Sequence, residues 1–162
     1  MTQAPIVQKT LILGLGNPLR EDDGIGLRVV QDLATRDLPD DVEIMDGGTR
    51  GLELVTLLEG RRRVIVVDAA EMGREPGDVK RFSMAEAHLP GTEKQLSVHS
   101  AGLGDALLLA EALGVLPQEL VIFGIQPASL EWGTTLSPKL ERTIPRVVGG
   151  ILAELAKAAP LP

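Results

Sequence analysis

Aspartate side chains stand at the ends of three separate apolar runs in this sequence. The acidic pair Asp22 and Asp23 comes soon after the first run, and Asp46 comes at the end of the second. Asp68 directly follows the β-branched run 64–67. A carboxylate in such a place is costly to bury unless a cation or a hydrogen-bond donor meets it. These aspartates are therefore candidates for acid–base chemistry or for binding a divalent cation.

Histidine occurs twice in the chain, as His88 and His99. His88 falls in a polar stretch, so we expect it on the surface. His99 comes just before a Leu- and Ala-rich segment that is typical of a helix. Together with Asp23 and Asp68 it offers the imidazole and carboxylate ligands that suit a divalent transition metal. Spacing alone does not establish a metal site, because these three residues lie far apart and form no local motif.

The aspartates also have purely structural interpretations. An acidic residue at a helix N-terminus caps free N–H groups and complements the helix dipole, so Asp22 or Asp23 could be the cap of the helix expected next. Asp46 is followed by Gly47 and Gly48, where it could be an ordinary Asx-turn residue. Both interpretations stay open at this point.

The elements that would position these residues alternate between strands and helices. Apolar runs predict strands, and apolar residues at helical spacing predict helices. This alternation indicates an α/β fold with three layers, in which a mostly parallel twisted sheet of about five strands is sandwiched by helices. Ligands of such sheets bind beyond the carboxyl ends of the strands, which is where the aspartates are expected. The expected strands are 10–15, 42–45, 64–67, 79–83 (at an edge) and 120–125, and the expected helices are 24–38, 52–58, 101–113 and one that starts at 138.

Two stretches, 84–97 and 126–136, show no period and are predicted to be loops beside that crevice, where substrate selectivity usually resides. The second contains Trp132, the only tryptophan. Trp132 could anchor a protein partner or could simply pack under its own loop. In the last helix, Ser137 is the expected N-cap and Pro145 is expected to kink or weaken the helix.

Composition narrows the classes of function. The length of 162 residues predicts a single domain over 1–162, with its core at about 10–156. A net charge of −7 is a poor match to nucleic acid. The absence of cysteine excludes disulfides, thiolate zinc sites, iron–sulfur clusters and a cysteine nucleophile. No apolar run is long enough to span a membrane and no signal peptide is evident, so we expect a soluble cytoplasmic protein.

The glycine-rich segment 14–19 begins like a dinucleotide-binding fingerprint, but Leu19 replaces the third glycine and Pro18 interrupts the turn. A tight strand-to-loop turn is the simpler interpretation. The same opening resembles peptidyl-tRNA hydrolases, which continue with a loop that carries a histidine, whereas this chain has an acidic run at 21–23. An acidic chain also lacks the basic face that a tRNA-binding protein presents.

Over residues 11–26 the sequence resembles the signature of the hydrogenase maturation endopeptidases, the proteases that process the large subunit of nickel–iron hydrogenases. Further blocks follow in the family's order, so the resemblance extends over about 10–156. These further blocks are Asp46-Gly47-Gly48-Thr49 with 51–54, Val66-Val67-Asp68-Ala69, 97–103, and Gly124-Ile125-Gln126-Pro127 with 129–131.

The resemblance implies a twisted sheet between helices and assigns roles to the aspartates. By this likeness Asp23, Asp68 and His99 contact the metal, and Asp46 is a further carboxylate of the active cleft and a candidate acid–base group. Asp23 stands where relatives often have Glu, so Asp22 stays an alternative for the first ligand. The predicted catalytic residues are thus Asp23, Asp46 and Asp68, and the predicted substrate-binding residues are Gly47, Gly48, Thr49 and Trp132.

The resemblance also implies the substrate, which is the large-subunit precursor after nickel insertion, and the reaction, which removes its C-terminal extension. The nickel would arrive with the substrate, held by substrate cysteines, although another divalent ion can substitute in the isolated protein. The absence of cysteine fits such a visiting metal, because oxygen and nitrogen ligands hold nickel more weakly than thiolates. We expect a monomer that acts on this precursor without nucleic acid or membrane. A nickel-checkpoint module that binds without cleaving is the non-enzymatic alternative.

Overall fold

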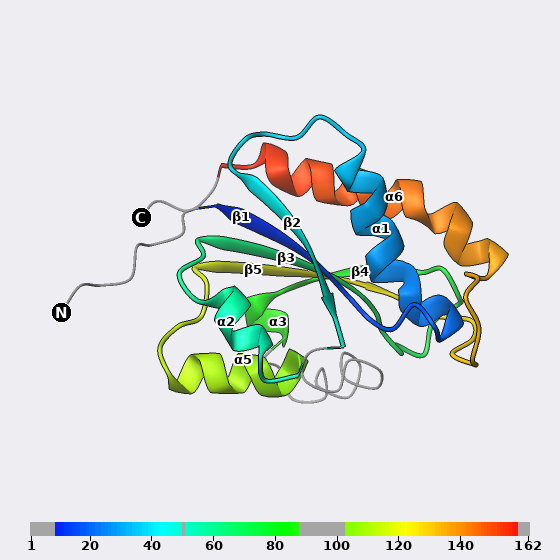
Figure 1. Ribbon diagram of the computed structural model, residues 1–162, viewed down its shortest axis with the longest axis horizontal. Helices are drawn as coiled ribbons and strands as arrows, with labels where there is room; N and C mark the ends of the chain where they lie inside the picture. The colour runs from blue at the N-terminus through cyan, green and yellow to red at the C-terminus, as the bar shows by residue number, and fades with distance from the viewer. Residues whose placement is uncertain (1–8, 50, 88–102, 159–162) are drawn as a thin grey trace.

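The computed structural model describes residues 9–49, 51–87 and 103–158. Within these residues five strands form one sheet in the order β2-β1-β3-β5-β4, with helices on both faces (Figure 1). β2, β1, β3 and β5 run parallel, and β4 is an antiparallel edge strand. This arrangement confirms the three-layer α/β fold predicted from the sequence. The strands are β1 (Thr10–Leu15), β2 (Val42–Gly48), β3 (Arg63–Ala69), β4 (Val79–Ser83) and β5 (Glu119–Ile125), and the helices are η1 (Glu21–Gly24), α1 (Ile25–Ala34), α2 (Leu54–Leu58), α3 (Met84–Ala87), α5 (Leu103–Ala112) and α6 (Pro138–Ala156).

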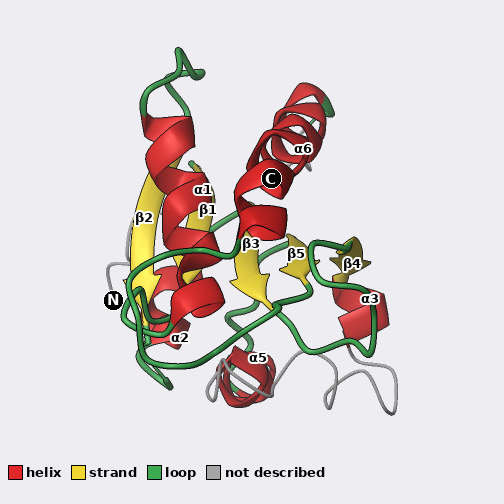
Figure 2. Ribbon diagram, turned by 90° about the vertical axis from the view of Figure 1, so that its right-hand side faces the viewer, coloured by secondary structure: helices red, strands yellow, loops and turns green. Residues whose placement is uncertain are grey.

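Two apolar cores lie on opposite faces of the sheet. α1 and α6 cover one face, and α2, α3 and α5 cover the other (Figure 2). Alternate residues of each strand enter alternate cores: in β3, Ile65 and Val67 face α1 and α6, whereas Val64 and Val66 face α2 and α5. Because helices cover both faces of the sheet, the central strand is an unbroken apolar run. This explains why 64–67 is the clearest strand signal in the sequence.

The chain direction reverses between β1 and β3. From β1 it passes through α1 on one face to β2, and it then returns through α2 on the other face to β3. The connections therefore leave β1 and β3 in opposite directions, which opens a crevice at their carboxyl ends. Figure 2 views the sheet from this end. The short helix η1, which follows β1, contacts β3 and so lies across this switch point.

Glycine lets α1 approach the two central strands closely. A Cβ atom on Gly26 would lie 2.3 Å from the carbonyl oxygen of Leu15 and 2.5 Å from that of Val67. A Cβ atom on Gly14 would in turn lie 2.6 Å from the carbonyl oxygen of Gly26. The glycines of the first motif thus serve helix–strand packing and the turn that follows β1, which agrees with the simpler of the two interpretations of that segment.

The start of α1 differs from the sequence prediction. α1 begins at Ile25 with Gly24 as its N-cap and has no side-chain cap, so neither Asp22 nor Asp23 caps it. Both aspartates lie in the preceding turn, η1, and their carboxylates accept hydrogen bonds from other parts of the chain. The helix also ends at Ala34 rather than at residue 38. The interpretation of Asp22 or Asp23 as the N-cap of this helix was therefore wrong.

β2 and β3 extend further than predicted at their carboxyl ends, where the aspartates lie. Asp46 pairs with Gly14 inside β2, and Asp68 pairs with Gly124 inside β3. Each residue had been expected just beyond its strand. The extension arises because neighbouring parallel strands continue the hydrogen-bond ladder past the last apolar residue.

One helical segment also departs from expectation. Met84–Ala87 forms α3, although 84–97 was predicted to be a loop, and the rest of that stretch lies outside the described residues. Ser83 and Glu86 supply its start signal, because the Glu86 N–H donates to the Ser83 hydroxyl at 3.3 Å. α6 continues through Pro145, so the proline does not end the helix, and the expected kink or weakening stays a prediction. None of the described helices combines the length and apolar composition needed to cross a membrane.

Candidate active site

The turn after β1 is folded so that Asp23 lies over the end of that strand. Gly16 has φ +115°, and a Cβ atom there would lie 1.9 Å from the carbonyl oxygen of Asp23, so a side chain at this position would collide with the returning backbone. The Asn17 N–H donates to Asp23 Oδ2 at 2.7 Å. The side chain of Asn17 in turn accepts the Leu19 N–H at 2.9 Å. The turn therefore fixes the orientation of the Asp23 carboxylate.

Asp23 has one oxygen that the described part of the chain leaves unsatisfied. The residue is 4% exposed, and its Oδ1 has no hydrogen-bond partner and no ion pair among the described residues. A buried acceptor left in this way costs about 1–3 kcal/mol, and more when it is charged. An incoming cation would remove that cost. The Asp23 carboxylate thus has the chemistry of a ligand for a metal that comes from outside the chain.

Asp68 lies on the neighbouring central strand, near the carboxyl end of β3, and is 3% exposed. Since β1 and β3 are adjacent and η1 contacts β3, the structure brings Asp23 and Asp68 to the same end of the sheet on the two sides of the switch point. The third predicted ligand, His99, lies outside the described residues, as does His88. Among the residues that are described, no three His, Cys, Asp or Glu side chains are grouped to hold a metal. A three-ligand site therefore depends on His99 and stays a prediction.

Asp22 is fully buried and has different partners from its neighbour. Its Oδ2 accepts hydrogen bonds from the Ala128 N–H at 2.8 Å, the Ser129 N–H at 3.1 Å and the Ser137 hydroxyl at 2.9 Å. Its Oδ1 accepts the Ser137 N–H at 2.7 Å. Because these four donors occupy the carboxylate, the structure favours Asp23 over Asp22 as the ligand from this turn.

Asp46 is exposed, and its Oδ1 accepts the Gly48 N–H at 2.8 Å. This contact is the Asx-type bond that the structural interpretation expected, and it engages Oδ1. The neighbouring glycines have local reasons of their own, because a Cβ atom on Gly47 would lie 2.6 Å from the Leu15 side chain and Gly48 has φ +55°. Thr49 is exposed. The catalytic role of Asp46 and the substrate-binding roles of Gly47, Gly48 and Thr49 stay predictions.

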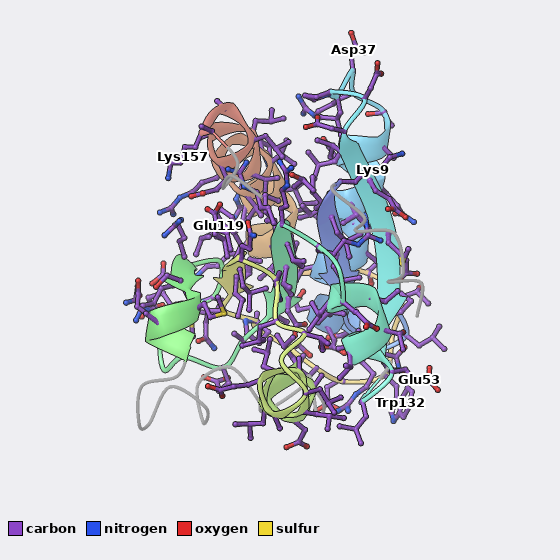
Figure 3. All side chains as sticks on the ribbon, turned by 90° about the vertical axis from the view of Figure 1, so that its left-hand side faces the viewer. Lys9, Asp37, Glu53, Glu119, Trp132 and Lys157 are labelled. Atoms are coloured by element: carbon purple, nitrogen blue, oxygen red, sulfur yellow. The ribbon has the colours of Figure 1, made fainter. Side chains whose placement is uncertain are left out.

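Trp132 does not pack under its own loop. It is 75% exposed, and Figure 3 shows its side chain at the periphery of the molecule. The guanidinium carbon of Arg20 lies 5.6 Å from the centroid of the indole ring, and Arg20 Nε donates to the carbonyl oxygen of Leu130 at 3.1 Å. Backbone bonds from Gly133 to Leu19 (2.9 Å) and from Glu21 to Gly133 (3.0 Å) join this loop to the Asp23 turn. The prediction that 126–136 lies beside the crevice is confirmed.

Gln126 is a positioning residue that the sequence analysis missed. It is 3% exposed and follows β5. Its amide oxygen accepts the N–H groups of Met72 (2.7 Å) and Arg74 (3.3 Å), and its amide nitrogen donates to Glu71 at 2.9 Å. Gln126 therefore fixes the loop that follows Asp68. The signal available in the sequence was a glutamine directly after the apolar run 120–125.

Comparison with known proteins gives consistent results. A family model described as hydrogenase maturation protease matches residues 27–154. The hydrogenase 2 maturation protease of Escherichia coli K12 is 37% identical over 152 residues, which are 93% of this chain and 92% of the relative. The hydrogenase expression/formation protein HupD of Bradyrhizobium diazoefficiens is 41% identical over 138 residues, or 84% of this chain and 72% of the relative.

The fold agrees with a solved structure of the same kind. The Escherichia coli hydrogenase maturating endopeptidase HybD superimposes with a TM-score of 0.83 and 36% identity, and the match covers 91% of this chain and 92% of that one. The fold, the family model and the relatives agree over most of the chain, including β3, the strand that carries the buried Asp68. This chain belongs to the hydrogenase maturation protease family.

Proposed function

We propose that this chain is an endopeptidase that removes the C-terminal extension of the large-subunit precursor of a nickel–iron hydrogenase after nickel insertion. The observation that supports this most directly is the unsatisfied Oδ1 of Asp23, buried at the switch point between β1 and β3. In this proposal a metal ion bound to the substrate is the missing partner of this oxygen. Family membership favours this reaction over the peptidyl-tRNA hydrolase alternative.

In this proposal Asp23, Asp68 and His99 contact the nickel of the substrate. Ligand distances near 2.0–2.3 Å, on the order of those usual for first-row transition metals, are expected in the complex. The chain has no cysteine, so it holds nickel more weakly than the cysteines of the precursor do, and the metal stays with the substrate on release. The isolated protein should accordingly purify largely free of metal.

Asp46 is proposed as the acid–base group near the scissile bond. Its exposure lets a substrate peptide reach it, and the bond from the Gly48 N–H fixes the carboxylate through Oδ1. A carboxylate held in this way can take a proton from an attacking water and return it to the leaving amine. The metal beside the scissile region would polarise the carbonyl group or act as a checkpoint for nickel insertion.

Trp132 and the rim around it are proposed to bind the precursor. Exposed aromatic side chains are frequent anchors of protein interfaces, and this one belongs to a loop bonded to the Asp23 turn. We further propose that the chain works as a cytoplasmic monomer without nucleic acid or membrane. Its charge of −7 supports the exclusion of nucleic acid.

The test is incubation of the purified chain with nickel-loaded precursor, followed by intact-mass measurement of the large subunit. A shorter product is expected from the nickel-loaded form and not from a matched nickel-free preparation. If the chain binds the loaded precursor without shortening it, it is a checkpoint module. If it neither binds nor cuts, the proposed function is wrong for this precursor.

A further inference from the structure

Asp22 is a fully buried carboxylate to which the proposed reaction assigns no role. It lies next to Asp23 in η1, yet among the described residues no cation pairs with it. Its charge is instead met by three backbone N–H groups and one hydroxyl, all from the segment 128–137. The carboxylate therefore binds one particular segment of the chain, and a displaced segment would leave a buried charge without donors.

Ser137 shows that these bonds take precedence over local structure. Ser137 occupies the N-cap position of α6, where its side chain normally accepts an N–H of the first helical turn. Here it makes no such side-chain bond, and its hydroxyl donates to Asp22 at 2.9 Å instead. The helix thus starts without a side-chain cap while the segment 128–137 is held at both ends, at Ala128 and Ser129 and again at Ser137.

The residues between those two ends carry the exposed rim. Trp132 lies between the clamped positions, and Arg20, two residues before Asp22, stacks on its ring. Backbone hydrogen bonds of Gly133 with Leu19 and with Glu21 join the same two segments. The turn that orients Asp23 and the loop that presents Trp132 are therefore parts of one bonded unit.

We propose that Asp22 is a positioning residue for the proteolysis: it fixes the loop that carries Trp132 relative to the turn that carries Asp23. Because the position of the loop is fixed, a precursor that binds Trp132 already has its nickel close to Asp23. Because this role assumes that the chain cuts the precursor, it rests on the proposed function.

The first test reads the loop directly. Trp132 is the only tryptophan, so time-resolved fluorescence anisotropy reports the motion of this loop alone. Asp22→Asn replaces one acceptor oxygen with an NH₂ group that faces other donors. We expect faster local motion of Trp132 with an unchanged far-ultraviolet circular dichroism spectrum. Asp32→Asn, at a partly exposed aspartate of α1, is the matched control and should leave the anisotropy unchanged.

The second test separates positioning from catalysis. Asp22→Asn should raise KM for the nickel-loaded precursor about tenfold while kcat falls less than about threefold. In a Trp132→Ala background the same substitution should raise KM less than about twofold, because the residue it positions is already gone. Additive effects of the two substitutions on KM would overturn the proposal, as would a large fall in kcat with KM unchanged.

Ser137 supplies a milder pair of variants should Asp22→Asn fold poorly. Ser137→Ala removes only the hydroxyl donor and should shift anisotropy and KM in the same direction by a smaller amount. Ser137→Thr keeps a hydroxyl and should restore both. Unchanged anisotropy and KM in Ser137→Ala and Asp22→Asn together would overturn the role of Asp22. A wild-type chain that cuts no precursor would overturn the proposed function instead, while the anisotropy would still decide whether Asp22 holds the loop.

Discussion

Buried charges have different partners at the two ends of the sheet. At the amino end, buried charges meet opposite charges within the chain: Arg63 pairs with Glu119, and Glu154 pairs with Arg81. At the carboxyl end, the described residues provide no cation for Asp22 or Asp23, and one oxygen of Asp23 has no donor. The amino end is built for stability. At the carboxyl end, the part of the chain that the structure describes leaves one carboxylate oxygen uncompensated, and in the proposed function a ligand from outside the chain meets it.

Arg63 illustrates how complete the compensation is at the amino end. It is 2% exposed, and its guanidinium donates to Glu119 at 3.0 Å and to the carbonyl oxygens of Glu154, Lys157 and Ala158 at 3.3, 3.1 and 2.7 Å. The last carbonyl groups of a helix have no partner within it, so Arg63 caps the end of α6. Figure 3 shows Glu119 and Lys157 at the opposite side of the molecule from Trp132.

Asp23→Asn should produce the largest effect, and it should fall on activity alone. Loss of the charge removes the ligand for the substrate's nickel, so processing should fall by at least about a thousandfold. Stability should change by less than about 1 kcal/mol, because no ion pair is lost. Gel densitometry of the product and urea unfolding measure the two quantities. A variant that processes precursor at the normal rate would make Asp23 a mere turn former.

Arg63→Ala should do the reverse. Removing the cation leaves Glu119 and the end of α6 without their partner, which should lower the free energy of unfolding by about 3 kcal/mol. Processing per folded molecule should stay as in wild type. Arg36→Ala, which breaks an exposed pair with Asp32, is the control and should cost no more than about 1 kcal/mol. Equal stability losses in the two variants, measured by urea unfolding, would remove the distinction between the two ends.

Asp46→Asn should lower turnover without loosening the complex. We expect kcat to fall about a hundredfold and the affinity for precursor to change less than about twofold, since the residue is assigned to proton transfer. The bond from the Gly48 N–H can persist with the asparagine oxygen. Single-turnover rates and equilibrium binding give the two values. Parallel losses in both would show that Asp46 recognises the substrate.

Trp132→Ala should weaken binding of the precursor by roughly 1–3 kcal/mol. The melting temperature should hardly change, because the side chain is exposed. Isothermal titration and thermal unfolding measure these quantities. A large drop in melting temperature with intact binding would place Trp132 among the residues of the fold rather than of the site.

The smallest expected effect is a pH dependence at the amino end. Burial raises the pKa of the Glu154 carboxyl, but hydrogen bonds from Arg81 and Lys157 outweigh it and hold the pKa below its ordinary value of 4.5. The stabilisation is therefore full above pH 4.5 and is lost as the pH falls through the pKa of the folded protein. In Glu154→Gln the free energy of unfolding should fall less steeply as the pH is lowered below 4.5.

Urea unfolding from neutral to acid pH measures the difference between wild type and Glu154→Gln. The control is Glu141→Gln, because Glu141 pairs with Arg28 on the surface and should keep the wild-type slope. Identical slopes in all three proteins would show that the pair of Glu154 and Arg81 does not contribute to acid sensitivity.

Layer order and strand positions could be predicted from the sequence because they depend on local patterns. The apolar run 64–67 marks the central strand, and the alternation of runs and helical segments marks the βαβ architecture. The Ser83 and Glu86 signal for α3 was also present but went unused. The aspartates could be placed at one end of the sheet because parallel strands end together.

The different hydrogen-bond partners of Asp22 and Asp23 could not be predicted from the sequence. The two residues are chemically identical neighbours, and the donors that occupy Asp22 come from positions 106 to 115 residues further along the chain. The exposure of Trp132 was equally undetermined, because an isolated aromatic residue in an irregular loop shows no period. Both features depend on tertiary contacts between loops, which sequence patterns do not encode.

The most direct test of the central claim, that nickel of the substrate meets Asp23, is the affinity for precursor with and without nickel. Biolayer interferometry on a chain with Asp46→Asn, which slows cleavage, would measure it with Asp23 intact and replaced by Asn. With Asp23 intact, the nickel-loaded form should bind at least about tenfold more tightly than the nickel-free form. With Asp23→Asn the two forms should bind almost equally. A variant that keeps the full preference for nickel would contradict the account.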